Sequence, residues 1–260
     1  MANSENTSKP SPIIVLGWDG AEWDIIETLC EAKEMPHLKA LRAYGSEAHI
    51  ASLQPMLSPL LWTSVATGKR AHEHGVLGFV EESMEGPRPI SSRQRKVPAL
   101  WNILSEAGYR SQVLNWWPSN PPEVIKGDFI SNLAFADAPL ANQSYPESWQ
   151  AYLNEVRQSS AEISPSILTP FLGDFKDTKP PEELKEALSQ ILKRTKWQFE
   201  MSMEMLNHTA DCRFFYFEAL DQIQHLANRF LPASKQVEAI PEMIRAAYRW
   251  HDAMLGSILS

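Results

Sequence analysis

Two residues with metal-binding side chains follow the expected strand at 212–218. They are Asp221 and His225, which stand four positions apart. In a helical turn this spacing places both side chains on one face. A carboxylate oxygen and an imidazole nitrogen are ligands that suit zinc or manganese. The same spacing is also typical of a surface ion pair, so the sequence alone leaves both interpretations open.

A second carboxylate, Asp19, follows a continuous apolar run at 12–17 and precedes Gly20. A glycine lets the backbone approach a ligand closely, because it carries no Cβ. Open α/β sheets bind their ligands just beyond the carboxyl ends of the strands. Asp19 is therefore either a metal ligand or the N-cap of the helix that follows it.

The third place is Ser58, which stands at the start of an expected helix and is followed by Pro59. Backbone N–H groups and the helix dipole at such a position favour a phosphate oxygen and a deprotonated alkoxide. Ser58 is thus a candidate nucleophile, or only an N-cap with Pro59 at the first helical position. Lys69 and Arg70, further along, either bind a second anionic group of a substrate or end the helix in solvent.

The elements that must position these residues alternate between strand and helix. The run at 12–17 is continuous and β-branched, which predicts a strand buried on both faces of a parallel sheet. The alternating order favours the α/β class, with a doubly wound, mostly parallel sheet flanked by helices. Further strands are expected at 48–53, 111–115, 129–131 and 212–218, and helices at 23–32, 36–44 and 100–107.

The pattern changes between residues 133 and 210. Several prolines separate stretches of helical periodicity, of which 182–206 is the longest. We interpret 133–210 as a helical insertion or cap over the sheet, within a single catalytic domain at 12–260. The polar segment at 1–11 is expected to be a disordered tail.

Composition excludes several classes of protein. With 260 residues, of which 43% are hydrophobic, the chain can bury a large core. Its 24 basic and 32 acidic residues give a net charge of −8, which argues against a nucleic-acid partner. Cys30 and Cys212 stand far apart and are expected to be buried free thiols. Without a secretory signal or an apolar segment of membrane-spanning length, we expect a cytoplasmic protein with no membrane partner.

Five blocks of sequence carry a resemblance to a known family. In chain order they read GWDGAEWDII, MPHLKALRAYGSEA, LSPLLWTSVATGKRAHEHGVLGF, RKVPALWNILSEAGYRSQVLNWWPSNPPE and YFEALDQIQHLANRF. These blocks resemble the type I phosphodiesterase/nucleotide pyrophosphatase branch of the alkaline phosphatase superfamily. The resemblance implies an alkaline phosphatase-like core that is C-terminally incomplete in this chain.

The resemblance also implies a reaction and a role for each candidate residue. Ser58 matches the nucleophile that becomes transiently phosphorylated, and Asp19 matches a ligand of one metal ion together with the Ser58 side chain. Asp221 and His225 match ligands of the other ion. Two divalent cations, zinc or manganese, would then serve the hydrolysis of a small phosphorylated substrate.

The chain departs from the family pattern at two places. Leu61 stands where nucleotide pyrophosphatases usually carry an Asn that helps to hold the phosphate, which argues against nucleotide substrates. The segment 248–260 resembles the helix that precedes the family's Asp-His-Gly metal motif, so the remaining metal ligands are expected beyond Ser260. The alternative is a catalytically inactive, truncated relative that binds a phosphorylated ligand or a protein partner. A sulfatase is disfavoured, because that class needs Pro two residues and Arg four residues after the reactive Cys or Ser. This chain has Leu60 and Trp62 at those positions.

Overall fold

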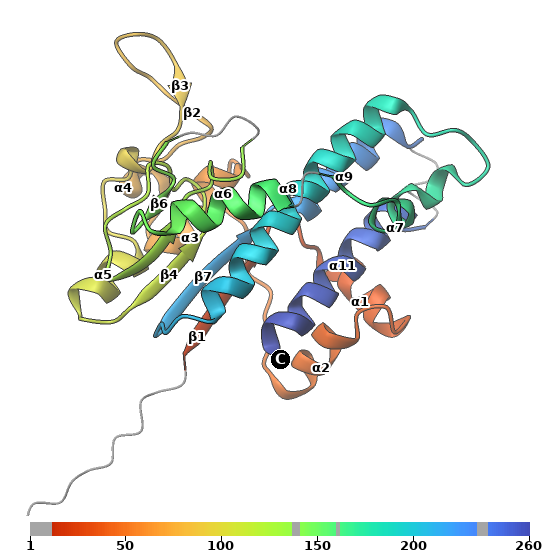
Figure 1. Cartoon of the computed structure of the whole chain (residues 1–260), viewed down its shortest axis with the longest axis horizontal. Helices are drawn as coiled ribbons and strands as arrows, with labels where there is room; N and C mark the ends of the chain where they lie inside the picture. The colour runs from red at the N-terminus through yellow and green to blue at the C-terminus, as the bar shows by residue number, and fades with distance from the viewer. Residues whose placement is uncertain (1–11, 137–140, 160–161, 233–238) are drawn as a thin grey trace, which may run out of the picture.

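The protein is described by a computed structural model that covers residues 12–136, 141–159, 162–232 and 239–260. The disordered tail predicted at 1–11 lies outside these ranges. A five-stranded sheet forms the centre of the molecule (Figure 1), with the strand order β1-β7-β4-β5-β6. The four strands from β1 to β5 in this order are parallel, and β6 is antiparallel to β5. The mostly parallel sheet predicted from the sequence is therefore confirmed.

The strands are short, and a separate hairpin projects from the body of the molecule. In the sheet they span Ile13–Trp18 (β1), Ser111–Leu114 (β4), Gly127–Ile130 (β5), Ser144–Tyr145 (β6) and Cys212–Phe217 (β7). The hairpin consists of Val80–Glu81 (β2) and Arg88–Pro89 (β3).

Helices cover both faces of the sheet (Figure 1), with α3 and α5 on one side and α6 and α8 on the other. In the first half of the chain they span Trp23–Glu31 (α1), Pro36–Tyr44 (α2), Ser58–Thr67 (α3), Ala71–His74 (α4), Ser92–Gln94 (η1, a 3₁₀ helix) and Leu100–Glu106 (α5). In the second half they span Trp149–Ser159 (α6), Pro165–Leu168 (α7), Thr169–Phe175 (η2, a 3₁₀ helix), Glu182–Leu206 (α8), Ala219–Phe230 (α9) and Glu242–Leu259 (α11).

The central strand β7 shows how the sequence builds this layered core. Phe214 and Tyr216 pack on the side of α3 and α5, whereas Phe215 and Phe217 pack on the side of α6 and α8. Successive side chains of a strand point to opposite faces, so an unbroken apolar run fills two cores at once. Cys212 and Cys30 are buried free thiols, as predicted.

Two predictions about strands are wrong. Residues 48–53 form no strand and are mostly exposed, because no strand in the described part of the chain lies beside them to accept their hydrogen bonds. The first strand is not buried on both faces. It pairs only with β7, at one end of the described sheet, and Ile13 is 62% exposed.

The segment predicted as a helical insertion does contain the helices α6, α7 and α8. The longest of them, α8, packs against β4, β7, α6 and α9. It begins and ends where the sequence predicted, at Glu182 and Leu206. The assignment of 133–210 as an insertion or cap within a single domain stays a prediction. No helix in the described ranges is long and apolar enough to span a membrane.

Candidate active site

The first two predicted site residues are brought together at the carboxyl end of the sheet. Asp19 directly follows β1, and Ser58 is the first residue of α3. The Ser58 hydroxyl donates a hydrogen bond of 2.9 Å to Oδ2 of Asp19. Neither residue is a helix N-cap, because Glu22 precedes α1 and Leu57 precedes α3 in that position. The N-cap interpretation is therefore wrong for both residues.

The Asp19 carboxylate accepts two more hydrogen bonds, from residues that the sequence analysis missed. Trp62 donates through Nε1 to Oδ1 at 3.0 Å, and the Tyr216 hydroxyl donates to Oδ2 at 2.7 Å. Burial, reinforced by the charges of Asp19 and Glu218, raises the pKa of Tyr216 well above its ordinary value, so its phenol stays protonated and can donate. One signal was available, since Trp62 stands four residues after Ser58 on the same helix face.

Gly17 in β1 makes room for the Trp62 ring. A Cβ at Gly17 would lie 2.7 Å from Cζ3 of Trp62, closer than carbon atoms can approach. The ring also packs edge-on against Trp116 and Tyr216, at centroid distances of 5.3 and 4.8 Å. Packing against Gly17, Trp116 and Tyr216, together with the hydrogen bond, fixes the direction of the indole N–H toward Asp19.

The second predicted pair, Asp221 and His225, lies on α9. His225 Nε2 is 3.5 Å from Oδ1 of Asp221, and the side chains are 76% and 38% exposed respectively. They share one helix face, as the spacing predicted. Burial raises the pKa of Asp221, the charge of Asp19 raises it further, and His225 opposes the shift. The like charge of Asp19 acts on Asp221, which means that the two predicted pairs are electrostatic neighbours.

Gly20 is the reason that the two pairs can be neighbours. The Asp221 N–H donates to the Asp19 carbonyl oxygen at 3.1 Å, and a Cβ on Gly20 would lie 2.8 Å from the Asp221 Cα. Gly20 also has φ +71°, a left-handed conformation that glycine adopts without strain. Gly20 was expected to let a ligand approach the backbone closely. Instead, the missing Cβ leaves room for the backbone at the start of α9.

A further carboxylate, Glu218, lies at this same carboxyl edge of the sheet. It follows β7 directly, and Trp117 donates through Nε1 to its Oε2 at 3.1 Å. Burial raises the pKa of Glu218. Its position directly after a strand is the same feature that indicated Asp19. The prediction missed Glu218 because it placed this residue inside the strand at 212–218.

The described residues supply part of a ligand set for metal ions. Asp19 with Ser58 and Asp221 with His225 offer the oxygen and nitrogen donors that suit zinc or manganese. A metal site built by protein alone usually has three or four such ligands. Within the described ranges, no group of three or more His, Cys, Asp and Glu side chains could hold a metal ion. The two pairs therefore fit a metal chemically but do not complete a site.

The mostly parallel sheet flanked by helices, with Asp19 and Ser58 joined at its carboxyl edge, has the alkaline phosphatase-like α/β fold that the sequence predicted. Comparison with known proteins gives the family. The model of the type I phosphodiesterase/nucleotide pyrophosphatase family matches residues 13–260, and the chain belongs to this family. The resemblance found in the sequence is thereby confirmed.

Two solved structures share the fold. Two crystal structures of phosphonoacetate hydrolase from Sinorhizobium meliloti 1021, in complex with phosphonoformate and with phosphonoacetate, are each 16% identical, with a TM-score of 0.58. Each match covers 95% of this chain and 52% of the other. Murine ectonucleotide pyrophosphatase/phosphodiesterase 5 is 13% identical with a TM-score of 0.49, over 96% of this chain and 52% of that one. The chain thus spans about half the length of these proteins, and no curated protein sequence matches it.

Proposed function

We propose that this chain carries the nucleophile and part of the metal-binding side chains of a hydrolase that cleaves small phosphate esters. Ser58 would be the nucleophile, with two divalent metal ions, zinc or manganese, as cofactors. The observation that carries the proposal is the 2.9 Å hydrogen bond between Ser58 and Asp19 at the carboxyl edge of the sheet. Membership of the type I phosphodiesterase/nucleotide pyrophosphatase family supports the same reaction class.

The residues of the chain account for how the nucleophile is oriented. The Asp19 carboxylate accepts a hydrogen bond from the Ser58 hydroxyl and so holds Oγ in one position. Trp62 and Tyr216 in turn hold the carboxylate. A nucleophile held in place reacts faster, because the cost of orienting it has been met during folding. The N–H groups at the start of the ten-residue helix α3 favour the phosphate oxygens there.

The proposed reaction has two displacements at phosphorus. Ser58 Oγ loses its proton and forms a bond to phosphorus while the bond from phosphorus to the leaving oxygen breaks. The leaving group departs with that proton as an alcohol, and Ser58 carries the phosphoryl group. Water then cleaves the phosphoserine and restores Ser58. Asp19 and Ser58 would hold one metal ion, and Asp221 and His225 the other. When bound, the ions would supply the positive charge that lowers the pKa of the Ser58 hydroxyl and offsets the charge of the phosphate.

The test uses bis-p-nitrophenyl phosphate and the protein produced from its native gene, with zinc or manganese added. We expect release of p-nitrophenolate, its loss on chelation of the metal, and its abolition by Ser58→Ala. Ser58→Thr keeps a hydroxyl at the same position and should keep a measurable rate. Full activity of Ser58→Ala would overturn the proposal.

One observation favours a second candidate function. The incomplete ligand set within the described residues is what a catalytically inactive relative would show, and such a protein would bind a phosphorylated ligand or a protein partner. The intact mass of the protein from its own cell separates the two candidates. A mass well above 29.4 kDa would allow further metal ligands and favour the hydrolase, whereas a mass near 29.4 kDa would favour the inactive relative.

A further inference from the structure

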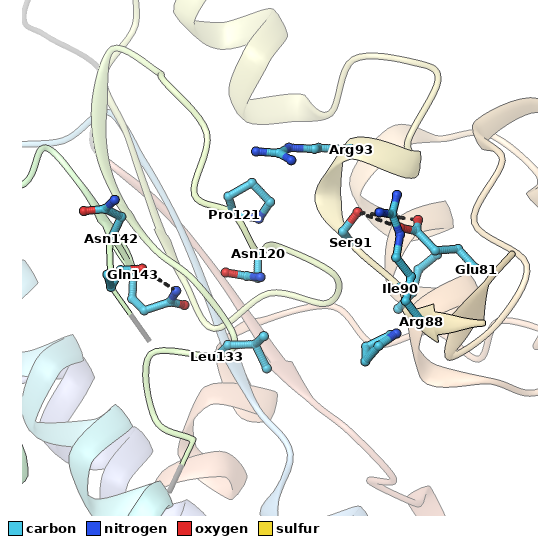
Figure 2. A pocket seen from close by; sticks show the side chains of 12 residues that line it. Glu81, Arg88, Ile90, Ser91, Arg93, Asn120, Pro121, Leu133, Asn142 and Gln143 are labelled. Carbon is cyan, nitrogen blue, oxygen red and sulfur yellow. Dashed lines mark hydrogen bonds and ion pairs between the residues drawn. The ribbon is translucent and has the colours of Figure 1, made fainter. Parts of the chain in front are cut away.

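A polar cavity lies between the β2/β3 hairpin and the loops that follow β4 and β5 (Figure 2). Its volume is about 550 Å³, which is large enough for a small organic ligand. Asn120 comes from the loop after β4, and Leu133 from the loop after β5. These loops leave the carboxyl ends of parallel strands, the edge at which Asp19 also lies. The cavity is therefore on the ligand-binding edge of the sheet.

The charges around the cavity favour an anion. Among the lining residues that the structure describes, Glu81 is the one carboxylate, and Arg88 neutralises it, with Nε 2.5 Å from Oε1. Arg93 stands apart from this pair, and Figure 2 shows its guanidinium extending over the cavity toward Pro121. Its side chain makes no hydrogen bond or ion pair with any residue that the structure describes. The described part of the lining thus keeps one positive charge, that of Arg93, in a chain whose net charge is −8.

The far side of the cavity offers neutral hydrogen-bonding groups. Asn142 lies opposite the Arg88 side in Figure 2, and Asn120 lies between the two sides. The buried amide of Gln143, beside Asn142, is bonded to Ser131 and Ala141 and helps to hold this wall in place. Side-chain amides donate and accept hydrogen bonds at once. A guanidinium with nearby amides is a combination that binds an oxyacid anion, because the guanidinium fork matches carboxylate and phosphate oxygens.

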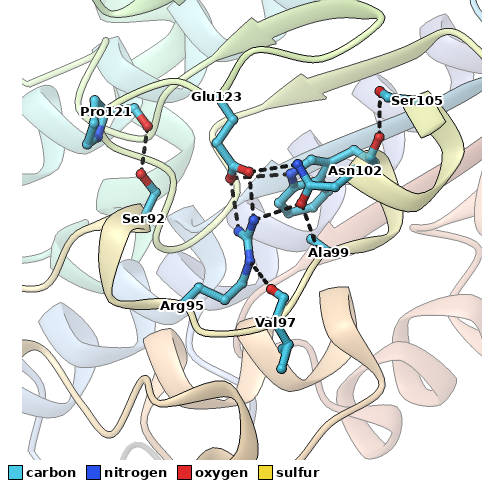
Figure 3. A network of polar contacts seen from close by, with 9 residues as sticks. Ser92, Arg95, Val97, Ala99, Asn102, Ser105, Pro121 and Glu123 are labelled. Atoms are coloured by element: carbon cyan, nitrogen blue, oxygen red, sulfur yellow. Dashed lines mark hydrogen bonds and ion pairs between the residues drawn. The ribbon is translucent and has the colours of Figure 1, made fainter.

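The walls of the cavity are tied together by hydrogen bonds. Ser92 donates from its backbone N–H to the Asn120 carbonyl oxygen at 2.8 Å, and from Oγ to the Pro121 carbonyl oxygen at 2.7 Å. Behind them, the guanidinium of Arg95 binds both carboxylate oxygens of Glu123 and the side-chain oxygen of Asn102 (Figure 3). The helix that bears Arg93 is therefore fixed against the loop after β4, so a ligand would meet a preformed site.

The same loop connects the cavity with the candidate active site. Trp117, three residues before Asn120, donates to Glu218, which precedes the helix that bears Asp221. The Phe79 ring packs edge-on against Trp117 at 5.9 Å, and the Phe79 carbonyl oxygen accepts from the N–H of Ile90, a residue of the cavity lining. Trp117 and Phe79 thus link the cavity lining with Glu218 at the end of β7.

We propose that this cavity binds a second anionic group of the substrate, a carboxylate or a phosphate carried on the part of the ester remote from the reacting phosphorus. Arg93 is the residue that recognises the charge. The inference rests on the proposed hydrolase function and names the substrate class: phosphate esters with a second anionic end. It differs from the alternative raised by the sequence, in which Lys69 and Arg70 bind that group, because neither residue lines this cavity. Arg70 lines a separate cavity together with His72.

The experiment measures binding without turnover. The probes are three p-nitrophenyl alkyl phosphate diesters that differ only at the end of the alkyl chain, which carries a methyl, a carboxylate or a phosphate group. Each is titrated calorimetrically into the Ser58→Ala protein, and then into the double variants with Arg93→Ala, Arg93→Lys or Lys69→Ala. Arg93 is exposed, so its replacement should leave the fold intact.

We expect the anionic probes to bind about tenfold or more tightly than the methyl probe, the size of effect that one charge-assisted hydrogen bond gives. Arg93→Ala should remove this preference, Arg93→Lys should restore part of it, and Lys69→Ala should leave it unchanged. The anionic probe with the larger preference identifies the group as carboxylate or phosphate. No preference in the parent protein, or a preference that survives Arg93→Ala or vanishes with Lys69→Ala, overturns the inference.

The proposed hydrolase function is tested separately, by release of p-nitrophenolate from the methyl probe with Ser58 intact. If the Arg93-dependent preference is found without any hydrolysis, anion binding in the cavity is supported and the proposed hydrolase function is rejected. Hydrolysis without the preference would support the reaction and reject the cavity.

Discussion

Gly20 and Asp221 are in backbone contact: a Cβ built on Gly20 would lie 2.8 Å from the Asp221 Cα and 3.0 Å from its backbone nitrogen. The contact joins the loop after β1 to the first turn of α9, which are 201 positions apart in sequence, from residue 20 to residue 221. It also places the Asp19 and Asp221 carboxylates close enough for the charge of Asp19 to raise the pKa of Asp221. A cation placed between them would relieve this repulsion.

Gly20→Ala should therefore lower the free energy of unfolding by about 1–3 kcal/mol, since the new methyl group meets backbone that cannot move aside. Gly68→Ala is the matched control, because Gly68 has a similar φ of +65° but nothing within 4 Å of its added Cβ. Urea unfolding of both variants isolates the cost of the contact. Equal losses would show that only the backbone angle matters.

Tyr216→Phe should weaken zinc binding roughly 10- to 100-fold, because hydrogen bonds to a ligating carboxylate orient it and tune its affinity. The variant removes the 2.7 Å hydrogen bond to Asp19 and little else. Tyr248→Phe serves as the control, since Tyr248 is also buried but bonds to the backbone of Glu22 and Gly20 instead of the carboxylate. Calorimetric titration with zinc compares the two. A similar affinity in both variants would mean that Tyr216 does not support a metal ligand.

His251 should make the protein less stable in acid. The ring is fully buried, burial lowers its pKa to about 4, and its Nδ1 lies 2.8 Å from the Ala247 carbonyl oxygen. The unfolded chain binds a proton at a pKa of about 6.5, so the folded state binds fewer protons between the two values. Stability is fully present above pH 6.5 and falls as the pH drops toward 4, by an amount on the order of 3 kcal/mol.

The measurement is the free energy of unfolding between pH 7 and pH 4 for the wild type and for His251→Phe. The variant keeps an aromatic ring beside Trp18 and Phe217 but cannot titrate. It should lose part of the pH dependence. An unchanged slope in His251→Phe would show that other groups cause the acid sensitivity.

Glu123→Gln should destabilise the protein by about 3–5 kcal/mol, because it leaves the Arg95 guanidinium in a buried position without its partner charge. The two side chains are only 8% and 18% exposed, and their closest atoms are 2.6 Å apart. The more exposed pair of Arg42 and Glu47, also 2.6 Å apart, gives the control, and Glu47→Gln should cost much less, because solvent screens that pair. Thermal unfolding tests the difference. If both variants lose the same amount, burial does not set the strength of the inner pair.

Local patterns in the sequence were sufficient for much of the fold. The apolar run at 214–217 has no polar face, and only a strand between two layers of helices buries both sides of such a run. The helices at 36–44 and 182–206 begin and end where periodicity, proline and glycine predicted, because these signals act within a few residues. The pair of Asp221 and His225 followed from helical spacing in the same way.

Only the tertiary structure determined which distant residues are in contact. Tyr216 reaches Asp19 because β1 and β7 are neighbours in the sheet, and Trp62 reaches it because α3 packs beside β1. The segment at 48–53 is not a strand, since a strand needs a partner and local sequence cannot supply one. The cavity beside Arg93 is likewise built from loops far apart in the chain. Sequence periodicity is a property of one segment, whereas hydrogen-bond partners, burial and charge pairing belong to two or more segments brought together by folding.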